Sequence, residues 1–247
     1  GALVGREGSV GILPGGTGNQ LARHLGIPLD VRRAVPALLR AGTVAMDLGR
    51  LGDGRYFSLT AGFGLDAAMI AGASPLAKRR FGVAAYVWSA ARALPAMQSF
   101  RIRATVDGET LELDAALAMI ANVGSVMDGR FGLGPDISPA DAALDLCVLS
   151  ARSLGDGVGL AWRMARRDFR ADPRMLFRRG RNIRLEALDA VAAQADGELL
   201  PSPTLDASVV PGAARFLAPR PAFVPNIGDT PLLRPAASRT SSTRSAQ

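Results

Sequence analysis

A glycine-rich segment at residues 14–19, with the sequence Pro-Gly-Gly-Thr-Gly-Asn, could bind a phosphate group. Glycine lets the backbone approach an oxyanion without Cβ clashes, and the N-terminus of a helix that follows offers free N–H groups and a positive dipole. The segment lacks the Lys-Ser/Thr of a P-loop and the third glycine of the dinucleotide fingerprint. The residues alone therefore leave two alternatives open, a phosphate cradle and a tight connection capped by Thr17 or Asn19.

Two Asp-Gly-Glu triplets carry carboxylates that could accept a proton. Asp107 lies between alternating runs at 100–106 and 110–113, where Asp-Gly predicts the turn of a β-hairpin. Asp196 follows a short apolar run, and without further information this triplet is also more often a turn than a site. Choosing between the two triplets requires more than the residues themselves.

Asp141 and Asp145 suit a cation site best, because hard cations take oxygen ligands from carboxylates and carbonyls. The alternative is a solvated Asp that caps a turn. Cys147 is the only cysteine and His24 the only histidine, which excludes an intrachain disulfide, a cysteine-cluster zinc site and a His-rich metal site. We expect Cys147 to be a small core residue and His24 to lie at the surface or at a domain contact.

Hydrophobic periodicity and turn residues predict the elements that must position these groups. A short buried strand at 9–13 precedes the glycine-rich turn, a helix at 21–25 follows it, and a second helix covers 31–40. Alternating runs and Asp-Gly turns begin near residue 45, where we place a domain boundary. Further strands are predicted at 56–61, 100–106, 110–113, 117–123, 144–149 and 183–187, helical segments from 66 and at 81–94, a basic helical region at 158–179, and a disordered tail at 225–247.

Composition limits the class of protein. The chain has 247 residues, 48% of them apolar, and 29 Lys and Arg against 22 Asp and Glu, which gives a net charge of +7. This charge favours anionic partners, but the basic residues are not interleaved with aromatic ones, so we expect no nucleic-acid binding. No apolar stretch is long enough for a transmembrane segment, and the single thiol fits a cytoplasmic location.

The order of several motifs closely resembles the diacylglycerol kinase catalytic family, which includes bacterial lipid kinases and the sphingosine and ceramide kinases. The resemblance covers about residues 8–220. Its segments, in family order, are 11–28, 47–49, 57–67, Asn122 with 135–145, 196–198 and 209–219. One such segment would be a weak signal, but several in order are specific.

The resemblance implies an α/β nucleotide-binding domain, of which residues 1–44 are a remnant, then a β-sandwich-like C-terminal domain at 45–212, with 213–220 as a strand that can return to the first domain. It implies a kinase that uses ATP and Mg²⁺ to phosphorylate a hydroxyl of diacylglycerol or a related lipid at a membrane surface. Asp196 then matches the catalytic base and Glu198 a supporting partner. The implied nucleotide-binding residues are Gly15, Gly16, Thr17, Gly18 and Asn19.

A structural Mg²⁺ in related bacterial enzymes implies three ligands in this chain, namely the Asp141 side chain and the backbone oxygens of Ser138 and Ala143. The chain has Ala142 where glycine is usual, which strains this loop if a positive φ is required. It also has Leu59 in the strand where Asn is frequent. The metal assignment and the turn-capping alternative both stay open on this basis.

Other features leave the activity of this chain open. Gln20 stands where many members have Asp, and the family's upstream Gly-Gly-Asp-Gly-Thr phosphate loop is not in this sequence. The alternatives are a catalytically dead lipid- or partner-binding module and a soluble small-molecule kinase related to NAD kinases. Peripheral membrane contact could use the basic region at 163–184, whose alternative is a solvated helix face, or the segment at 78–88.

Overall fold

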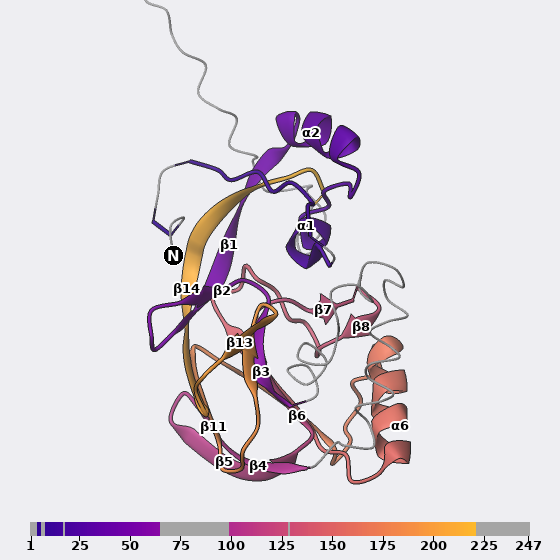
Figure 1. Ribbon diagram of the computed structural model, residues 1–247, viewed down its shortest axis with the longest axis vertical. Coiled ribbons are helices and arrows are strands. Elements are labelled where there is room, and N and C mark those ends of the chain that lie inside the picture. Colours follow the sequence, from indigo (N-terminus) through magenta and orange to yellow (C-terminus); the bar gives the residue numbers. More distant parts are fainter. Residues whose placement is uncertain (1–3, 6–7, 17, 65–98, 128, 221–247) are drawn as a thin grey trace, which may run out of the picture.

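Two six-stranded antiparallel sheets pack face to face, with two short helices at one end of the molecule and a third helix along one side (Figure 1). This computed structural model describes residues 4–5, 8–16, 18–64, 99–127 and 129–220. The helical segments expected from residue 66 and at 81–94, the basic segment at 78–88 and the tail at 225–247 lie outside the described residues. Fold class is nevertheless clear, because the β-sandwich expected for the C-terminal part is present.

The first sheet has the strand order β2-β1-β14-β11-β4-β5. Its centre is β14, a long strand that pairs with β1 on one side and with β11 on the other. The predicted boundary between residues 44 and 45 falls inside β1, and the division into domains stays a prediction. The strands are β1 (Gly42–Leu51), β2 (Tyr56–Phe57), β4 (Phe100–Val106), β5 (Glu109–Ala115), β11 (Asn182–Ala187) and β14 (Thr204–Ala218).

The second sheet has the strand order β10-β9-β6-β3-β12-β13. A separate two-stranded ribbon of β7 (Ser125–Val126) and β8 (Phe131–Gly132) lies beside it. The strands of the sheet are β3 (Thr60–Gly64), β6 (Leu117–Ala121), β9 (Leu144–Leu149), β10 (Met175–Gly180), β12 (Ala193–Ala195) and β13 (Glu198–Leu200).

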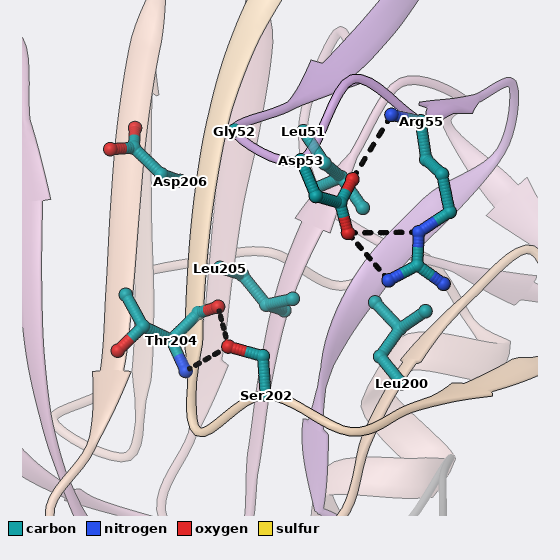
Figure 2. A pocket seen from close by; sticks show the side chains of 9 residues that line it. All are labelled: Leu51, Gly52, Asp53, Arg55, Leu200, Ser202, Thr204, Leu205 and Asp206. Atoms are coloured by element: carbon teal, nitrogen blue, oxygen red, sulfur yellow. Dashed lines mark hydrogen bonds and ion pairs between the residues drawn. The ribbon is translucent and has the colours of Figure 1, made fainter.

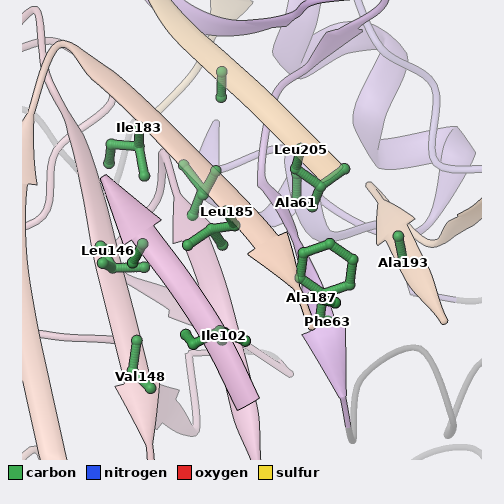
Figure 3. Packing of buried hydrophobic residues seen from close by; sticks show 14 of the residues in the cluster. Ala61, Phe63, Ile102, Leu146, Val148, Ile183, Leu185, Ala187, Ala193 and Leu205 are labelled. Carbon is green, nitrogen blue, oxygen red and sulfur yellow. The ribbon is translucent and has the colours of Figure 1, made fainter. Parts of the chain in front are cut away.

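The main hydrophobic core lies between the inner faces of the two sheets (Figure 3). Ile102 and Leu185 come from the first sheet, and Phe63 and Leu146 from the second, and all four are fully buried. Strand β4 alternates buried and exposed residues because only one of its faces is covered, whereas every residue of β9 is buried. Helix α6 (Leu154–Ala165) explains this difference, since it packs on the outer face of the second sheet and covers the side chains of β9 that point away from the sandwich.

The two short helices, α1 (Gln20–His24) and α2 (Val31–Leu39), form a second core with the ends of β1 and β14. Asp30 caps α2 by accepting a hydrogen bond from Arg32 N–H at 2.9 Å. Gly26 ends α1 with a φ of 69°, and a Cβ at this position would lie 2.0 Å from the Arg220 carbonyl oxygen. This close approach requires glycine and holds the C-terminal end of the described chain against α1.

The strand predicted at residues 9–13 is wrong in extent. Val10 alone bridges to β14, donating to the Arg215 carbonyl and accepting from Leu217 N–H, while Leu13 is 56% exposed. Pairing does not extend further because β14 ends at Ala218 and the next residue, Pro219, has no N–H to donate to a ladder.

Two other predicted elements need correction. The strand predicted at 56–61 is split into β2 and β3, because the amides of Ser58 and Leu59 bond to a side chain rather than to a neighbouring strand. The helical region predicted at 158–179 ends at Ala165, and β10 follows it. Arg167 adopts a φ of 54°, which terminates the helix, and beyond it Arg170 pairs with Asp168 and Arg174 with Asp172 instead of continuing a helical face.

Candidate functional site

Asp196 occupies the turn between β12 and β13, and its carboxylate accepts four hydrogen bonds from the bend between β2 and β3. Oδ2 accepts the Ser58 N–H at 2.6 Å and the Ser58 Oγ–H at 2.8 Å. Oδ1 accepts the amides of Leu59 at 2.8 Å and Thr60 at 3.1 Å. The turn places Asp196 at a φ of 47°, and Gly197 follows at 91°. The side chain is therefore fixed in one orientation, with both oxygens engaged as acceptors.

A cavity of about 230 Å³ lies beside this carboxylate. Asp196 and Ser58 supply polar groups to its lining, and Ile12 and Leu21 from the N-terminal segment face the same space as Phe216 of β14. The structure thus brings Asp196 to residues that lie directly before and after the glycine-rich turn in the sequence. The lining is mostly apolar, and the exposed Asp196 contributes its carboxylate to it.

A chain of hydrogen bonds connects the Asp196 bend to the loop that precedes β9. Asn122 is fully buried and donates from Nδ2 to the Ser58 carbonyl at 2.9 Å and to the Asp47 carbonyl at 2.8 Å. Asp47 is also buried, and its carboxylate accepts the amides of Ala142 and Gly212, each at 2.7 Å. The Asn122 Oδ1 atom is buried and has no hydrogen-bond partner in the described part of the chain. This network joins four of the motifs through which the chain resembles lipid kinases, namely 47–49, 57–67, Asn122 with 135–145, and 209–219.

Sequence reasoning missed the structural role of Ser58 and Asp47. The signal for Asp47 was present, because an acidic residue within the apolar run of β1 must find buried donors. Ser58 gave no such signal, since a serine near the end of a strand is common.

The glycine-rich turn is closed by Asn19. Its Oδ1 accepts Gly16 N–H at 2.9 Å, and its Nδ2 donates to the Gly16 carbonyl at 2.8 Å, so the side chain does not cap α1. Gly15 has open space where a Cβ would be, and neither Gly16 nor Gly18 needs a positive φ. Thr17 lies outside the described residues. A Cβ at Gly16 would lie 3.3 Å from Asn19 Oδ1, whereas the fold does not require glycine at 15 or 18, and a ligand that approaches the backbone closely would account for those two.

The predicted metal loop has a different cation against it. Arg179 on β10 lies with Nε 3.0 Å from Asp145 Oδ1 and with Nη2 3.5 Å from Asp141 Oδ2. Asp141 also accepts the Ala143 amide at 3.2 Å, and Ala142 has a φ of 58°. Burial raises the pKa of both Asp141 and Asp145, and the guanidinium opposes that rise.

These contacts do not fit a divalent ion at Asp141 as the loop stands. Across the described ranges, no three His, Cys, Asp or Glu side chains are grouped to hold a metal ion. The assignment of Ser138, Asp141 and Ala143 as ligands stays a prediction.

Glu198 is exposed at the start of β13, opposite Ala195, and its charge acts on Arg55. Arg55 lines a second cavity of about 250 Å³ together with its partner Asp53 (Figure 2). The predicted site residues do not line this second cavity, so we place the candidate site at Asp196.

The remaining candidates have structural roles. Asp107 forms the β4–β5 turn, as predicted, with a φ of 46°, and its carboxylate accepts the amides of Arg181 and Asn182. Cys147 is fully buried, as predicted, and burial raises its pKa to about 12. His24 contacts the β7–β8 ribbon, with Nε2 2.9 Å from the Ser125 carbonyl oxygen, which fits the expected domain contact.

Comparison with known proteins gives the same pattern. Residues 60–218 match the family described as YegS C-terminal NAD kinase beta sandwich-like domain, and residues 1–51 match the diacylglycerol kinase catalytic domain. The chain is 25% identical over 191 residues to a diacylglycerol kinase of Bacillus subtilis (strain 168), covering 77% of this chain and 62% of that protein. It is 23% identical over 189 residues to a diacylglycerol kinase of Staphylococcus carnosus (strain TM300), covering 76% and 61%.

The chain thus spans about three fifths of the length of these curated relatives. A crystal structure of a diacylglycerol kinase from Bacillus anthracis str. Sterne matches with a TM-score of 0.64 at 18% identity, covering 87% of this chain and 68% of that one. At this identity the likeness establishes the fold alone. The family matches cover most of the chain in the expected order, and the chain belongs to the diacylglycerol kinase family, with a YegS-type β-sandwich as its larger part.

Proposed function

We propose that this chain is the acceptor-binding and base-bearing part of an ATP-dependent lipid kinase, which transfers a phosphoryl group to a hydroxyl of diacylglycerol or a related lipid. The observation that carries the proposal is Asp196, held by backbone amides at an apolar cavity. An apolar acceptor with a single hydroxyl would bury its chain there and direct the hydroxyl to the carboxylate. Phosphoryl transfer needs positioning and a group that takes the hydroxyl proton, and Asp196 supplies both.

The glycine-rich turn supports the nucleotide half of the proposal. Gly15 and Gly16 are exposed, and the Asn19 side chain fixes the turn that they form. Backbone amides of such a turn can contact phosphate oxygens at close range. Mg²⁺ would enter with the nucleotide and neutralise phosphate charge, while residues of this chain hold the turn and the acceptor.

Helix α6 supports peripheral contact with an anionic membrane. Val158 is 59% exposed and Trp162 is 63% exposed, one helical turn apart, and the Arg166 guanidinium lies 5.5 Å from the Trp162 ring centroid. Exposed tryptophan with adjacent arginine suits the headgroup region of a bilayer. The described residues contain no helix that is long and apolar enough to cross a membrane.

A second candidate function is lipid binding without transfer. The specific observation behind it is the saturation of Asp196, since each carboxylate oxygen already accepts two hydrogen bonds. In that case the cavity would hold an apolar ligand, and no proton would move to the carboxylate. For the remaining alternative, a soluble small-molecule kinase related to NAD kinases, no feature of the described site gives specific support.

The test is transfer of radiolabelled phosphate from ATP to diacylglycerol, sphingosine or ceramide in mixed micelles. This chain is compared with a version extended upstream through any Gly-Gly-Asp-Gly-Thr loop. We expect Asp196→Ala to abolish transfer in the extended version and Asp107→Ala to retain it, because both remove a hairpin-turn carboxylate and only one lies at the cavity. Lipid binding without transfer in either version would favour the binding module.

Membrane contact is tested separately by sedimentation with phosphatidylglycerol vesicles. Trp162→Ala should weaken binding severalfold, whereas Leu39→Ala, which also removes an exposed apolar side chain, should not. Equal binding by all three proteins would remove α6 from the proposal.

A further inference from the structure

Arg179 lies in a set of oxygen atoms that resembles the ligand set of a divalent cation. Its Nε donates to Asp145 Oδ1 at 3.0 Å, and its Nη2 donates to the Asp136 carbonyl at 2.6 Å. The same nitrogen lies 3.4 Å from Asp145 Oδ2 and 3.5 Å from Asp141 Oδ2. Two carboxylates and a backbone carbonyl therefore surround one positive charge. Carboxylate and carbonyl oxygens are also the ligands that Mg²⁺ and Ca²⁺ take in proteins.

The loop needs a cation because its carboxylates are close together and poorly solvated. The Asp145 side chain is 11% exposed, Asp141 is 25% exposed, and Asp47 is buried behind them. Each negative charge raises the cost of the next, since the charge of Asp47 raises the pKa of Asp141 and the charge of Asp141 raises the pKa of Asp145. Without a positive charge, the segment between Asp136 and Asp145 would carry uncompensated repulsion at the start of β9.

The position of Arg179 is set by the sheet rather than by the loop. β10 pairs with β9 in a register that places Arg179 directly opposite Asp145. The preceding residue, Arg178, lies opposite Leu146. Arg178 is exposed and donates to the carbonyl of Phe177. The guanidinium is therefore delivered to the loop whenever the sheet is formed, with no ion from solution.

We propose that the Arg179 guanidinium is the built-in cation of the 136–145 loop, so that this loop folds without a divalent ion and becomes a divalent-cation site only when the guanidinium is removed. The inference does not depend on the lipid-kinase function. It concerns what stabilises the loop, and it predicts that a metal ion can take the place of the Arg179 guanidinium among the same oxygen atoms.

The experiment measures thermal unfolding after EDTA treatment, with and without millimolar Mg²⁺ or Ca²⁺. The midpoint of the wild-type chain should not respond to either ion. Arg179→Met should unfold about 4 °C lower in EDTA, since the loss of one such contact has an effect of this size in a chain of this length. Either ion should restore part of this loss in a saturable way, and Arg179→Met,Asp141→Asn should lose the restoration.

Arg178→Met is the matched control, because it removes a guanidinium from the neighbouring residue of the same strand. It should neither lower the midpoint in EDTA nor create a response to Mg²⁺. If Arg179→Met fails to fold, Arg179→Lys keeps a positive charge, and binding of Mg²⁺ to the wild-type chain is measured directly by calorimetry. Saturable Mg²⁺ binding by the wild-type chain, or an Arg179→Met variant as stable as wild type without ions, would overturn the proposal.

Discussion

Ser58 donates two hydrogen bonds to one oxygen of Asp196, from its amide at 2.6 Å and from its hydroxyl at 2.8 Å. The serine hydroxyl thus lies at the atom that an acceptor hydroxyl would have to reach. In one route the incoming hydroxyl replaces Ser58 Oγ as the hydrogen-bond donor to Asp196. In the other it donates to Ser58 Oγ, and Ser58 transfers its own hydroxyl proton to Asp196. The two routes give different outcomes when the serine side chain is removed.

Ser58→Ala should retain phosphoryl transfer within about threefold in the extended kinase. The three amide donors still hold Asp196, and an empty lone pair on Oδ2 receives the acceptor directly. The cost in stability should be about 0.5–1.5 kcal/mol, for one lost hydrogen bond. Transfer rates and urea midpoints measure both effects, and a hundredfold loss of kcat with unchanged KM would instead identify Ser58 as a proton relay.

Asp196→Asn should destabilise the fold by about 1–3 kcal/mol, because an amide nitrogen cannot accept the hydrogens that Ser58 or Leu59 donates. Catalytic loss in this variant is therefore interpretable only beside its urea unfolding curve. Asp206→Asn is a suitable control, since Asp206 forms an exposed pair with Arg184 and such pairs contribute little. Equal stability of Asp196→Asn and wild type would show that the four hydrogen bonds are not formed in solution.

Ala142→Gly should stabilise the chain by about 0.5–1 kcal/mol. Ala142 has a φ of 58°, where a Cβ is unfavourable, and its amide must stay in place to reach Asp47 Oδ2 at 2.7 Å. Glycine relieves this backbone strain. The higher conformational entropy of the unfolded glycine variant offsets only part of the stabilisation. Chemical denaturation measures the change, and a less stable variant would mean that the loop is not strained.

His24 should make stability fall as the pH drops below about 6.5. Burial lowers the pKa of His24 in the folded state, the hydrogen bond to Ser125 opposes this, and Arg167 adds to it. The unfolded chain therefore binds the proton more tightly, and each unit by which the pKa is lowered corresponds to about 1.4 kcal/mol. The stabilisation is complete above the unfolded pKa and is lost as the pH falls towards the folded one.

The measurement compares urea unfolding of wild type and His24→Gln at pH 7.5 and 5.5. Wild type should lose more stability between these values than the variant does. An identical pH dependence of the two proteins would show that His24 remains hydrated in the folded state.

Sequence patterns predicted the sandwich well where one face of a strand is covered. The alternation in 100–106 and the Asp-Gly turn at Asp107 gave a hairpin that the structure confirms, and 144–149, which is apolar except for Asp145, was correctly predicted as a strand. The sequence patterns failed where backbone amides donate to a distant side chain instead of to a neighbouring strand. The bend at Ser58 is imposed by Asp196, which is 138 residues away in the sequence, and no local pattern records such a contact.

The candidate site was predicted in part. Asp196 could be selected only through the motif order, because Asp107 has the same triplet and the same left-handed turn conformation. The partners of Asp47 could not be inferred, since they are backbone amides, which have no sequence signature. Arg179 was assigned to a helix, because arginines at 174, 178 and 179 fit helical spacing as well as they fit a strand paired with β9.

Strand β14 also determines the order in which the molecule can be completed. Gly42 pairs with Ala218 and Leu51 with Ala207, so one edge of β1 waits for nearly the last described residues, while β2 pairs only with Gly49 and Arg50 on its other edge. During synthesis the edge of β1 that pairs with β14 stays open while most of the chain emerges, and contacts between such distant residues form slowly. A chain stopped before residue 204 would keep the β4–β5 hairpin but expose β1 and β11, and it should be captured by chaperones rather than fold.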